Sequence, residues 1–161
     1  MTQPFNPPQN LPGLSNFAQV HTTPALWRGA RPTPDGIGLL AKWGCRTIID
    51  LEEIIYDFNW FEWIVTQHYG LTYKSIPMNP CHIELEDIKT ILEMVRDPAN
   101  GGIMVHCAHG SDRTGVAIGV VRLAIDHWPI ADVLAELEAF GWHNMLYPGV
   151  KTFLENLPDG L

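Results

Sequence analysis

Apolar positions along the chain follow two kinds of spacing. Four short runs of apolar and β-branched residues have the length of strands, and the longer segments between them repeat apolar residues every three or four positions, as helices do. The expected strands are Ala25–Arg28, Arg46–Leu51, Leu71–Ile76 and Ile103–His106. The expected helices are residues 33–44, Asp57–Tyr69, Glu84–Val95, Thr114–Asp126, Ala131–Phe140 and Gly149–Leu157. This alternation predicts an α/β fold: one domain with a central, mostly parallel sheet of about four to five strands, flanked by helices.

Local signals support several of these boundaries. Thr33 precedes Pro34, which suits a helix start with Thr33 as the N-cap and Pro34 at the first helical position. Gly70 ends the second helical segment. A cluster of turn-forming residues at 97–102 precedes the strand Ile103–His106. That strand is short and apolar up to its final residue, which predicts a central position in a parallel sheet.

The first 24 residues differ from the rest of the chain. They contain five Pro and show little periodicity. We therefore expect residues 1–24 to form an extended arm that lies over a domain made of residues 25–161. That second part contains no internal repeat and no linker, and its length suits one compact domain.

Composition argues against several classes of function. The net charge of −8 disfavours nucleic acid as a partner, because binding a phosphate backbone needs a basic surface. Three irregularly spaced Cys fit neither a disulfide framework nor a zinc site, so no structural metal is expected. No cofactor is expected either. No apolar run reaches the roughly 20 residues that span a bilayer, and the N-terminus lacks the pattern of a secretory signal. We therefore expect a cytoplasmic protein, with leaderless secretion as an open alternative.

The strongest chemical signal is the sequence HCAHGSDRTG at residues 106–115, between an apolar strand and a helix. A strand–loop–helix arrangement directs several backbone N–H groups and the positive end of the helix dipole at the centre of the loop, where a phosphate would fit. Cys107 lies at the end of the strand and faces the same concavity. A helix N-terminus and a nearby Arg favour the thiolate, the nucleophilic form of cysteine. The pattern therefore predicts Cys107 as the nucleophile.

Arg113 lies at the other end of the same loop. Its planar guanidinium can hold two phosphoryl oxygens and stabilise the charge that they carry in the transition state. Gly110 allows the loop to turn with a positive φ. Thr114 can donate its hydroxyl to the cysteine sulfur, and His106 is expected to fix the shape of the loop through its backbone.

This loop resembles the signature of the cysteine-based protein tyrosine and dual-specificity phosphatases. The sequence LWRGARPTPDGIGLLAKWGCRTIIDL at residues 26–51 also resembles the first third of small, atypical dual-specificity-like phosphatases of bacteria, plants and fungi. The resemblance covers roughly residues 25–126. It implies a metal-independent enzyme that forms a phosphocysteine on Cys107 and holds the phosphate with Arg113. The implied phosphate ligands are the backbone amides of Ala108, His109, Gly110, Ser111, Asp112 and Arg113.

The general acid of such an enzyme is not evident from the sequence. Related phosphatases supply an Asp about 30 residues before the Cys, but residues 77–84 here contain none. One interpretation assigns the acid to Asp112, whose alternative role is to begin the following helix. The other interpretation brings in Glu84, His82 or Asp87 from the preceding loop.

The expected substrate is a protein that carries phosphotyrosine, or another protein substrate of a dual-specificity phosphatase, or a phosphorylated small molecule. A phosphoinositide or inositol phosphate is an alternative, although Ser111 stands where many such enzymes place Lys and the strand end carries Glu52 and Glu53. A further alternative is a module that binds phosphate without turnover. Among enzymes, the main alternative to a phosphatase is a sulfurtransferase or an arsenate reductase, because both use a cysteine in a similar anion-binding loop.

Four other residues have two interpretations each. Arg28 and Arg31 either add positive potential beside the pocket or form a salt bridge at the sheet edge. Cys45 and Cys81 are either packed thiols or redox partners of Cys107.

Overall fold

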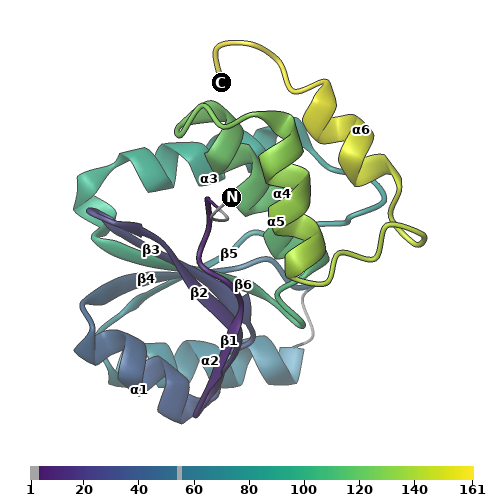
Figure 1. Ribbon diagram of the computed structural model, residues 1–161. Coiled ribbons are helices and arrows are strands. Elements are labelled where there is room, and N and C mark those ends of the chain that lie inside the picture. Colours follow the sequence, from purple (N-terminus) through teal and green to yellow (C-terminus); the bar gives the residue numbers. More distant parts are fainter. Residues whose placement is uncertain (1–3, 54–55) are drawn as a thin grey trace.

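A six-stranded sheet forms the centre of the molecule (Figure 1). The computed structural model describes residues 4–53 and 56–161, and of residues 56–58 the backbone alone. The strand order is β1-β2-β3-β6-β4-β5. Strands β3, β6, β4 and β5 run parallel, and β1 and β2 are antiparallel to their neighbours. Their bounds are β1 Gln9–Leu11, β2 Leu14–Thr22, β3 Ala25–Ala30, β4 Cys45–Asp50, β5 Thr72–Ser75 and β6 Gly102–Cys107. The predicted α/β class with a mostly parallel central sheet is confirmed.

Two of the six strands come from the segment expected to form an N-terminal arm. That segment is extended, but its residues 9–22 form β1 and β2, and β2 pairs with β3. The buried side chains of β2 include Leu14, Phe17 and Ala18, whose spacing does not alternate. A bulge between β1 and β2 interrupts the period of two, so the strand pattern is hidden in the sequence.

The helices match the predicted segments closely. They are α1 Pro34–Lys42, α2 Tyr56–His68, α3 Leu85–Arg96, α4 Asp112–Ala124, α5 Ile130–Ala139 and α6 Gly149–Glu155, with a short 3-10 helix η1 at Pro98–Asn100. Thr33 is the N-cap of α1, and its hydroxyl accepts a hydrogen bond from the N–H of Gly36 at 3.3 Å. Within the described part of the chain, no helix is both long and apolar enough to cross a membrane.

The helices form a layer on each face of the sheet (Figure 1). Helices α1 and α2 cover one face, and α3 to α6 cover the other. Adjacent residues of a strand point to opposite faces, so Ile48 of β4 packs in the first layer with Leu40, and Ile49 packs in the second with Val116. Helix α4 lies in the middle of the second layer, and its residues 114–122 are buried.

This topology brings the candidate loop to the centre of one sheet edge. Strand β6 lies between β3 and β4, and all three run in the same direction. Their carboxyl ends therefore meet at one edge, which is where ligands bind in open α/β sheets. The loop from β6 to α4 begins at this edge, directly beside the ends of β3 and β4.

Candidate active site

Cys107 is the last residue of β6, and α4 begins five residues later at Asp112. The Cys107 side chain is buried, with 2% of its surface exposed. The hydroxyl of Thr114, in the first turn of α4, donates to Cys107 Sγ at 3.1 Å. The predicted contact between the threonine hydroxyl and the sulfur is therefore present.

The loop packs tightly against β3 at Gly110. Gly110 has a φ of 72°, and a side chain there would place its Cβ 2.4 Å from the carbonyl carbon of Gly29. Any other residue would collide with the backbone of β3. The requirement for glycine, predicted from the turn alone, has a second cause in this close approach.

The inner side of the loop presents donors that the protein does not use. Among the described residues, no acceptor is bonded to the N–H groups of residues 108–113. The half-buried guanidinium of Arg113 likewise forms no hydrogen bond or ion pair with a described residue. Several N–H groups, a helix N-terminus and a guanidinium in one place form an anion-binding site.

Four residues of this loop, Ala108, His109, Asp112 and Arg113, line a cavity of about 480 Å³. Its size is ordinary for a small-molecule site. Its walls come from the loop, from the ends of β3 and β4, from the loop after β5 and from the loop after α5. The lining residues are Arg31, Glu52, Glu53, Asn79, Pro80, Cys81, Cys107, Ala108, His109, Asp112, Arg113 and Tyr147.

Asp112 lines the cavity, and both of its carboxylate oxygens face His143. Oδ1 accepts the backbone N–H of His143 at 2.8 Å, and Oδ2 lies 2.8 Å from the ring Nδ1 of the same residue. The contact fastens the loop after α5 to the start of α4. Asp112 therefore lies both in the wall of the cavity and in the first turn of α4, so its position agrees with both interpretations of this residue.

The other three candidates for the general acid do not line the cavity. His82 and Glu84 are both largely exposed and pair with each other at 2.9 Å. Asp87 lies in the first turn of α3, where burial and then the neighbouring Glu84 and Glu86 raise its pKa. Residues 79–81, which precede this group, do form part of the cavity wall.

Arg28 and Arg31 have different positions. Arg31 lines the cavity and is bound to Glu52, with Nε donating to Oε2 at 2.7 Å. This hydrogen bond raises the pKa of Arg31. Arg28 is fully buried beneath the loop rather than beside the cavity, 3.6 Å from Glu136 and 3.6 Å from the centre of the Phe140 ring.

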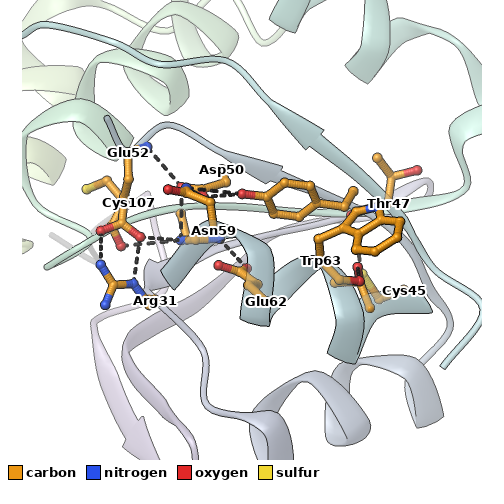
Figure 2. A network of polar contacts seen from close by, with 12 residues as sticks. Arg31, Cys45, Thr47, Asp50, Glu52, Asn59, Glu62, Trp63 and Cys107 are labelled. Carbon is orange, nitrogen blue, oxygen red and sulfur yellow. Dashed lines mark hydrogen bonds and ion pairs between the residues drawn. The ribbon is translucent and has the colours of Figure 1, made fainter. Parts of the chain in front are cut away.

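A network of buried polar groups lies behind Cys107 (Figure 2). His106 is fully buried, and its Nε2 lies 2.7 Å from Oε1 of Glu62 on α2. Burial opposes the charged imidazolium, but the attraction and hydrogen bond of Glu62, with help from Asp50 and Glu52, outweigh it and raise the pKa of His106 to about 9. A pKa of about 9 favours the cationic form of His106 near neutral pH, directly before Cys107 in the chain.

The same network contains side chains of the kinds that bind metal ions. Ligand-type atoms of Asp50, Glu62 and His106 lie within 4.8 Å of one another. However, Nε2 of His106 is already bonded to Glu62, and Asp50 accepts from Asn59 at 2.8 Å and from the hydroxyl of Tyr73. Groups that are bonded to one another in this way fit a protonated imidazole between carboxylates better than they fit a metal ion.

The two remaining cysteines differ in accessibility. Cys45 is buried, and burial raises its pKa to about 11, which makes it an inert packed thiol. Cys81 is exposed and lines the cavity, so the interpretation of Cys81 as a packed thiol is wrong. Cys81 belongs to a loop, and loops have no periodic pattern of apolar residues from which the exposure of a side chain could be predicted.

Three residues of the site had no recognisable signal in the sequence. Glu62 reaches His106 from α2, and His143 reaches Asp112 from the loop after α5. Asn16, in the expected arm, donates from its amide to the carbonyl of His109 at 3.0 Å. Each contact joins segments far apart in the chain, and a single sequence contains no information about such pairs.

The loop from Cys107 to Arg113 follows the carboxyl end of the central strand β6 in a mostly parallel sheet. This arrangement is that of a cysteine-dependent phosphatase domain. The sequence profile of the tyrosine phosphatase family matches residues 12–159. The chain belongs to this family. The match includes all of β2, which agrees with the place of that strand in the sheet.

Two relatives are named for the reactions that they catalyse. The dual specificity protein phosphatase TpbA of Pseudomonas aeruginosa is 24% identical over 124 residues, which are 74% of this chain and 53% of that protein. The inositol diphosphatase DSP3 of Arabidopsis thaliana is 26% identical over 129 residues, which are 77% of this chain and 61% of that protein. The chain thus aligns with little more than half the length of these relatives.

Solved structures share the fold. The core catalytic domain of the PP-IP phosphatase SIW14 from S. cerevisiae, in complex with citrate, superposes with a TM-score of 0.76 at 23% identity, covering 97% of this chain and 90% of that one. P. aeruginosa TpbA superposes with a TM-score of 0.70 at 18% identity, covering 95% and 98%.

Proposed function

We propose that the protein is a metal-independent phosphomonoesterase that works through a phosphocysteine on Cys107. One observation carries the proposal. Cys107, whose sulfur lies 3.1 Å from the Thr114 hydroxyl, lines the same cavity as the loop residues Ala108, His109, Asp112 and Arg113, whose N–H groups have no acceptor in the described part of the chain. A nucleophile and an anion site that share one cavity are what transfer of a phosphoryl group to sulfur requires.

In the first step, the thiolate attacks phosphorus. A P–S bond forms while the bond from phosphorus to the leaving oxygen breaks. The loop N–H groups and the fork of Arg113 hold the equatorial oxygens, whose charge is greatest in the transition state. An acid gives the leaving oxygen its proton, and we assign this role to Asp112.

In the second step, water attacks the phosphocysteine and releases inorganic phosphate. The P–S bond breaks, and the electron pair returns to sulfur. The Thr114 hydroxyl stabilises the departing thiolate by a hydrogen bond. Asp112, now ionised, accepts the proton of the water, which restores the starting state.

The charges around the cavity favour substrates with one phosphoryl group near the loop. Of the two arginines in its lining, Arg31 is bound to Glu52, and Glu53 adds a further negative charge. A highly phosphorylated inositol would need more unneutralised cations. Phosphotyrosine is the first substrate to test, and a solved structure of the relative TpbA contains pTyr.

Inositol diphosphates are the second candidate. Several relatives are named as inositol diphosphatases, at 25–27% identity. We therefore propose a panel of phosphotyrosine peptides, phosphoinositides, inositol phosphates and inositol diphosphates, with para-nitrophenyl phosphate as a general substrate. The proposed function requires turnover of at least one member by the wild type and its loss in Cys107→Ser. Binding of phosphate without turnover of any substrate would identify a binding module instead.

A further inference from the structure

The outward-facing carbonyl groups of the phosphate-binding loop each have a donor. A loop whose N–H groups converge on one point must turn its carbonyls the other way, and buried carbonyls need partners. Ala108 O accepts the N–H of Arg31 at 3.4 Å, and Ser111 O accepts the N–H of Gly115 at 3.0 Å. The two carbonyls between them are held by side chains from the N-terminal part of the sheet.

These two side chains are Asn16 and Arg28. The amide nitrogen of Asn16 donates to the carbonyl of His109 at 3.0 Å, and Nη2 of Arg28 donates to the carbonyl of Gly110 at 3.2 Å. Arg28 lies under the loop as a buried cation. Burial lowers its pKa to about 10, against the opposing effects of Glu136 and Cys107, so it keeps its charge at neutral pH.

The backbone at Asn16 is shaped to direct this side chain at the loop. Gln9 faces Phe17 and Leu11 faces Leu14, so two residues of β2 oppose a single residue of β1. Asn16 is in this bulge and has a φ of 47°, a conformation in which Asn is one of the few common non-glycine residues. Bulges often occur beside active sites, where they redirect a side chain.

The bulge also has its own support. The N–H of Asn16 donates to the side-chain oxygen of Asn10, the residue opposite, at 3.0 Å. The N–H of Asn16, which the bulge prevents from pairing with the backbone of β1, therefore still has a hydrogen-bond acceptor. The unusual conformation is held from the side of β1, which leaves the amide of Asn16 available for the loop.

The amide of Asn16 also joins the loop to the C-terminal end of α5. Its nitrogen lies 3.0 Å from the carbonyl of Phe140 and 3.5 Å from the hydroxyl of Ser111. That hydroxyl donates to the same Phe140 carbonyl at 2.8 Å. With two carbonyl oxygens in reach, the amide must present its N–H₂ group. Phe140 is the C-cap of α5, and the loop that follows carries His143 and Tyr147, of which Tyr147 lines the cavity.

We propose that Asn16 is a positioning residue of the phosphate-binding loop. By holding the carbonyl of His109 outward, it keeps the neighbouring N–H groups turned into the cavity. Without this donor, the peptide unit can rotate and bring a carbonyl dipole toward the bound anion, which weakens binding. The proposal rests on the proposed function only in that the loop binds a phosphoryl group.

The test measures binding of inorganic phosphate by calorimetry in full-length variants. Asn16→Gly keeps the left-handed backbone but removes the amide, and Asn16→Asp keeps the shape but replaces the donor with an anion. We expect dissociation constants about 10- to 100-fold higher than in the wild type, with Asn16→Asp the more severe. The matched control is Asn6→Ala, because the Asn6 amide donates to the Gln19 carbonyl at 2.8 Å in the same region without touching the loop. Its phosphate affinity should not change.

A second readout is the rate of Cys107 alkylation by iodoacetamide at low pH relative to high pH. Loop N–H groups that face the sulfur favour its thiolate, so this ratio should fall in Asn16→Gly and stay constant in Asn6→Ala. Both measurements are made well below the thermal midpoint of each variant. Unchanged phosphate affinity and alkylation in Asn16→Gly, even with a lower thermal midpoint, would mean that Asn16 is structural only.

The outcomes separate this proposal from the proposed function. If the wild type binds phosphate but hydrolyses nothing, the proposed function fails and the role of Asn16 is still decided by binding. If the wild type hydrolyses substrates and the Asn16 variants bind phosphate normally, only the role of Asn16 fails. A wild type that binds no phosphate overturns both.

Discussion

At the scale of single residues, the proposed chemistry depends first on the sulfur of Cys107. Cys107→Ser should reduce turnover of para-nitrophenyl phosphate below about a tenth of wild type, because a hydroxyl at this position is a far poorer nucleophile. Phosphate binding should persist, since the loop N–H groups and Arg113 remain. Cys45→Ala is the matched control, because this buried thiol lies at the first residue of β4, and the cavity lies beyond the last residue of that strand. Substantial activity in Cys107→Ser would exclude this cysteine as the nucleophile.

The second residue-scale prediction concerns the guanidinium of Arg113. Arg113→Lys keeps the charge but loses the planar fork, so kcat should fall by about 100- to 1000-fold. Arg46→Lys, an exposed substitution of the same kind, should have no effect on steady-state rates. A near-normal rate in Arg113→Lys would show that a point charge is sufficient and would contradict the proposed bidentate grip.

The third prediction separates two roles of Asp112. A general acid matters most when the leaving group is poor. If Asp112 is the acid, Asp112→Asn should slow an alkyl or tyrosyl phosphate far more than para-nitrophenyl phosphate, and the basic limb of the pH–rate profile should flatten. The contacts with His143 give the competing role, which is to hold the loop after α5.

The control for Asp112 is His143→Ala, which loosens the same contact but leaves the carboxyl group in place. We expect it to slow both substrates to a similar degree. If Asp112→Asn also slows both equally, its carboxyl shapes the loop, and Glu84, His82 and Asp87 become the residues to test.

At the scale of elements, α2 is linked to β6 through one buried ion pair. Glu62 raises the pKa of His106 from an ordinary 6.5 to about 9. Because the folded-state pKa is the higher one, this group's contribution to the free energy of unfolding is complete below about pH 6.5 and is lost as the pH rises through 9. The contribution is on the order of 3 kcal/mol.

Glu62→Gln should therefore lower stability at pH 6 and flatten its decline between pH 7 and pH 9. Urea unfolding at several pH values measures this. Glu93→Gln, on the exposed side of α3, is the control and should leave the decline in place. An unchanged pH dependence in Glu62→Gln would mean that His106 is neutral in the folded protein.

The elements also show what the sequence alone can predict. The four parallel strands and the six helices were predicted, because each has a local pattern of apolar residues or a capping signal. Strand β2 was not, because its bulge at Asn16 breaks the alternation that identifies a strand. The proposed nucleophile, Cys107, and its proposed partner, Arg113, could be chosen because both belong to one contiguous loop. The partners Asn16, Glu62 and His143 were not, because they reach the loop through tertiary contacts.

At the scale of the whole molecule, the proposed reaction needs no metal. The thiolate, the guanidinium and the loop amides supply the positive and nucleophilic groups for the transition state. Activity toward para-nitrophenyl phosphate should therefore be the same in excess chelator as in its absence. Loss of activity on chelation, with recovery on adding magnesium or zinc, would assign the protein to another mechanistic class.

The anchors of the phosphate-binding loop also bear on how the site forms during synthesis. Asn16 and Arg28 lie 93 and 82 residues before the carbonyls that they hold, and His143 lies 31 residues after its partner Asp112. Contacts across such separations form late, because the intervening chain must first be ordered. A nascent chain that ends within α4 already contains the entire signature from Cys107 to Arg113, yet it lacks the α5 wall and the His143 contact. Its Cys107 should react as an ordinary thiol until α5 and the loop that carries His143 have left the ribosome, so we expect a reactive Cys107 only after this later segment has been synthesised.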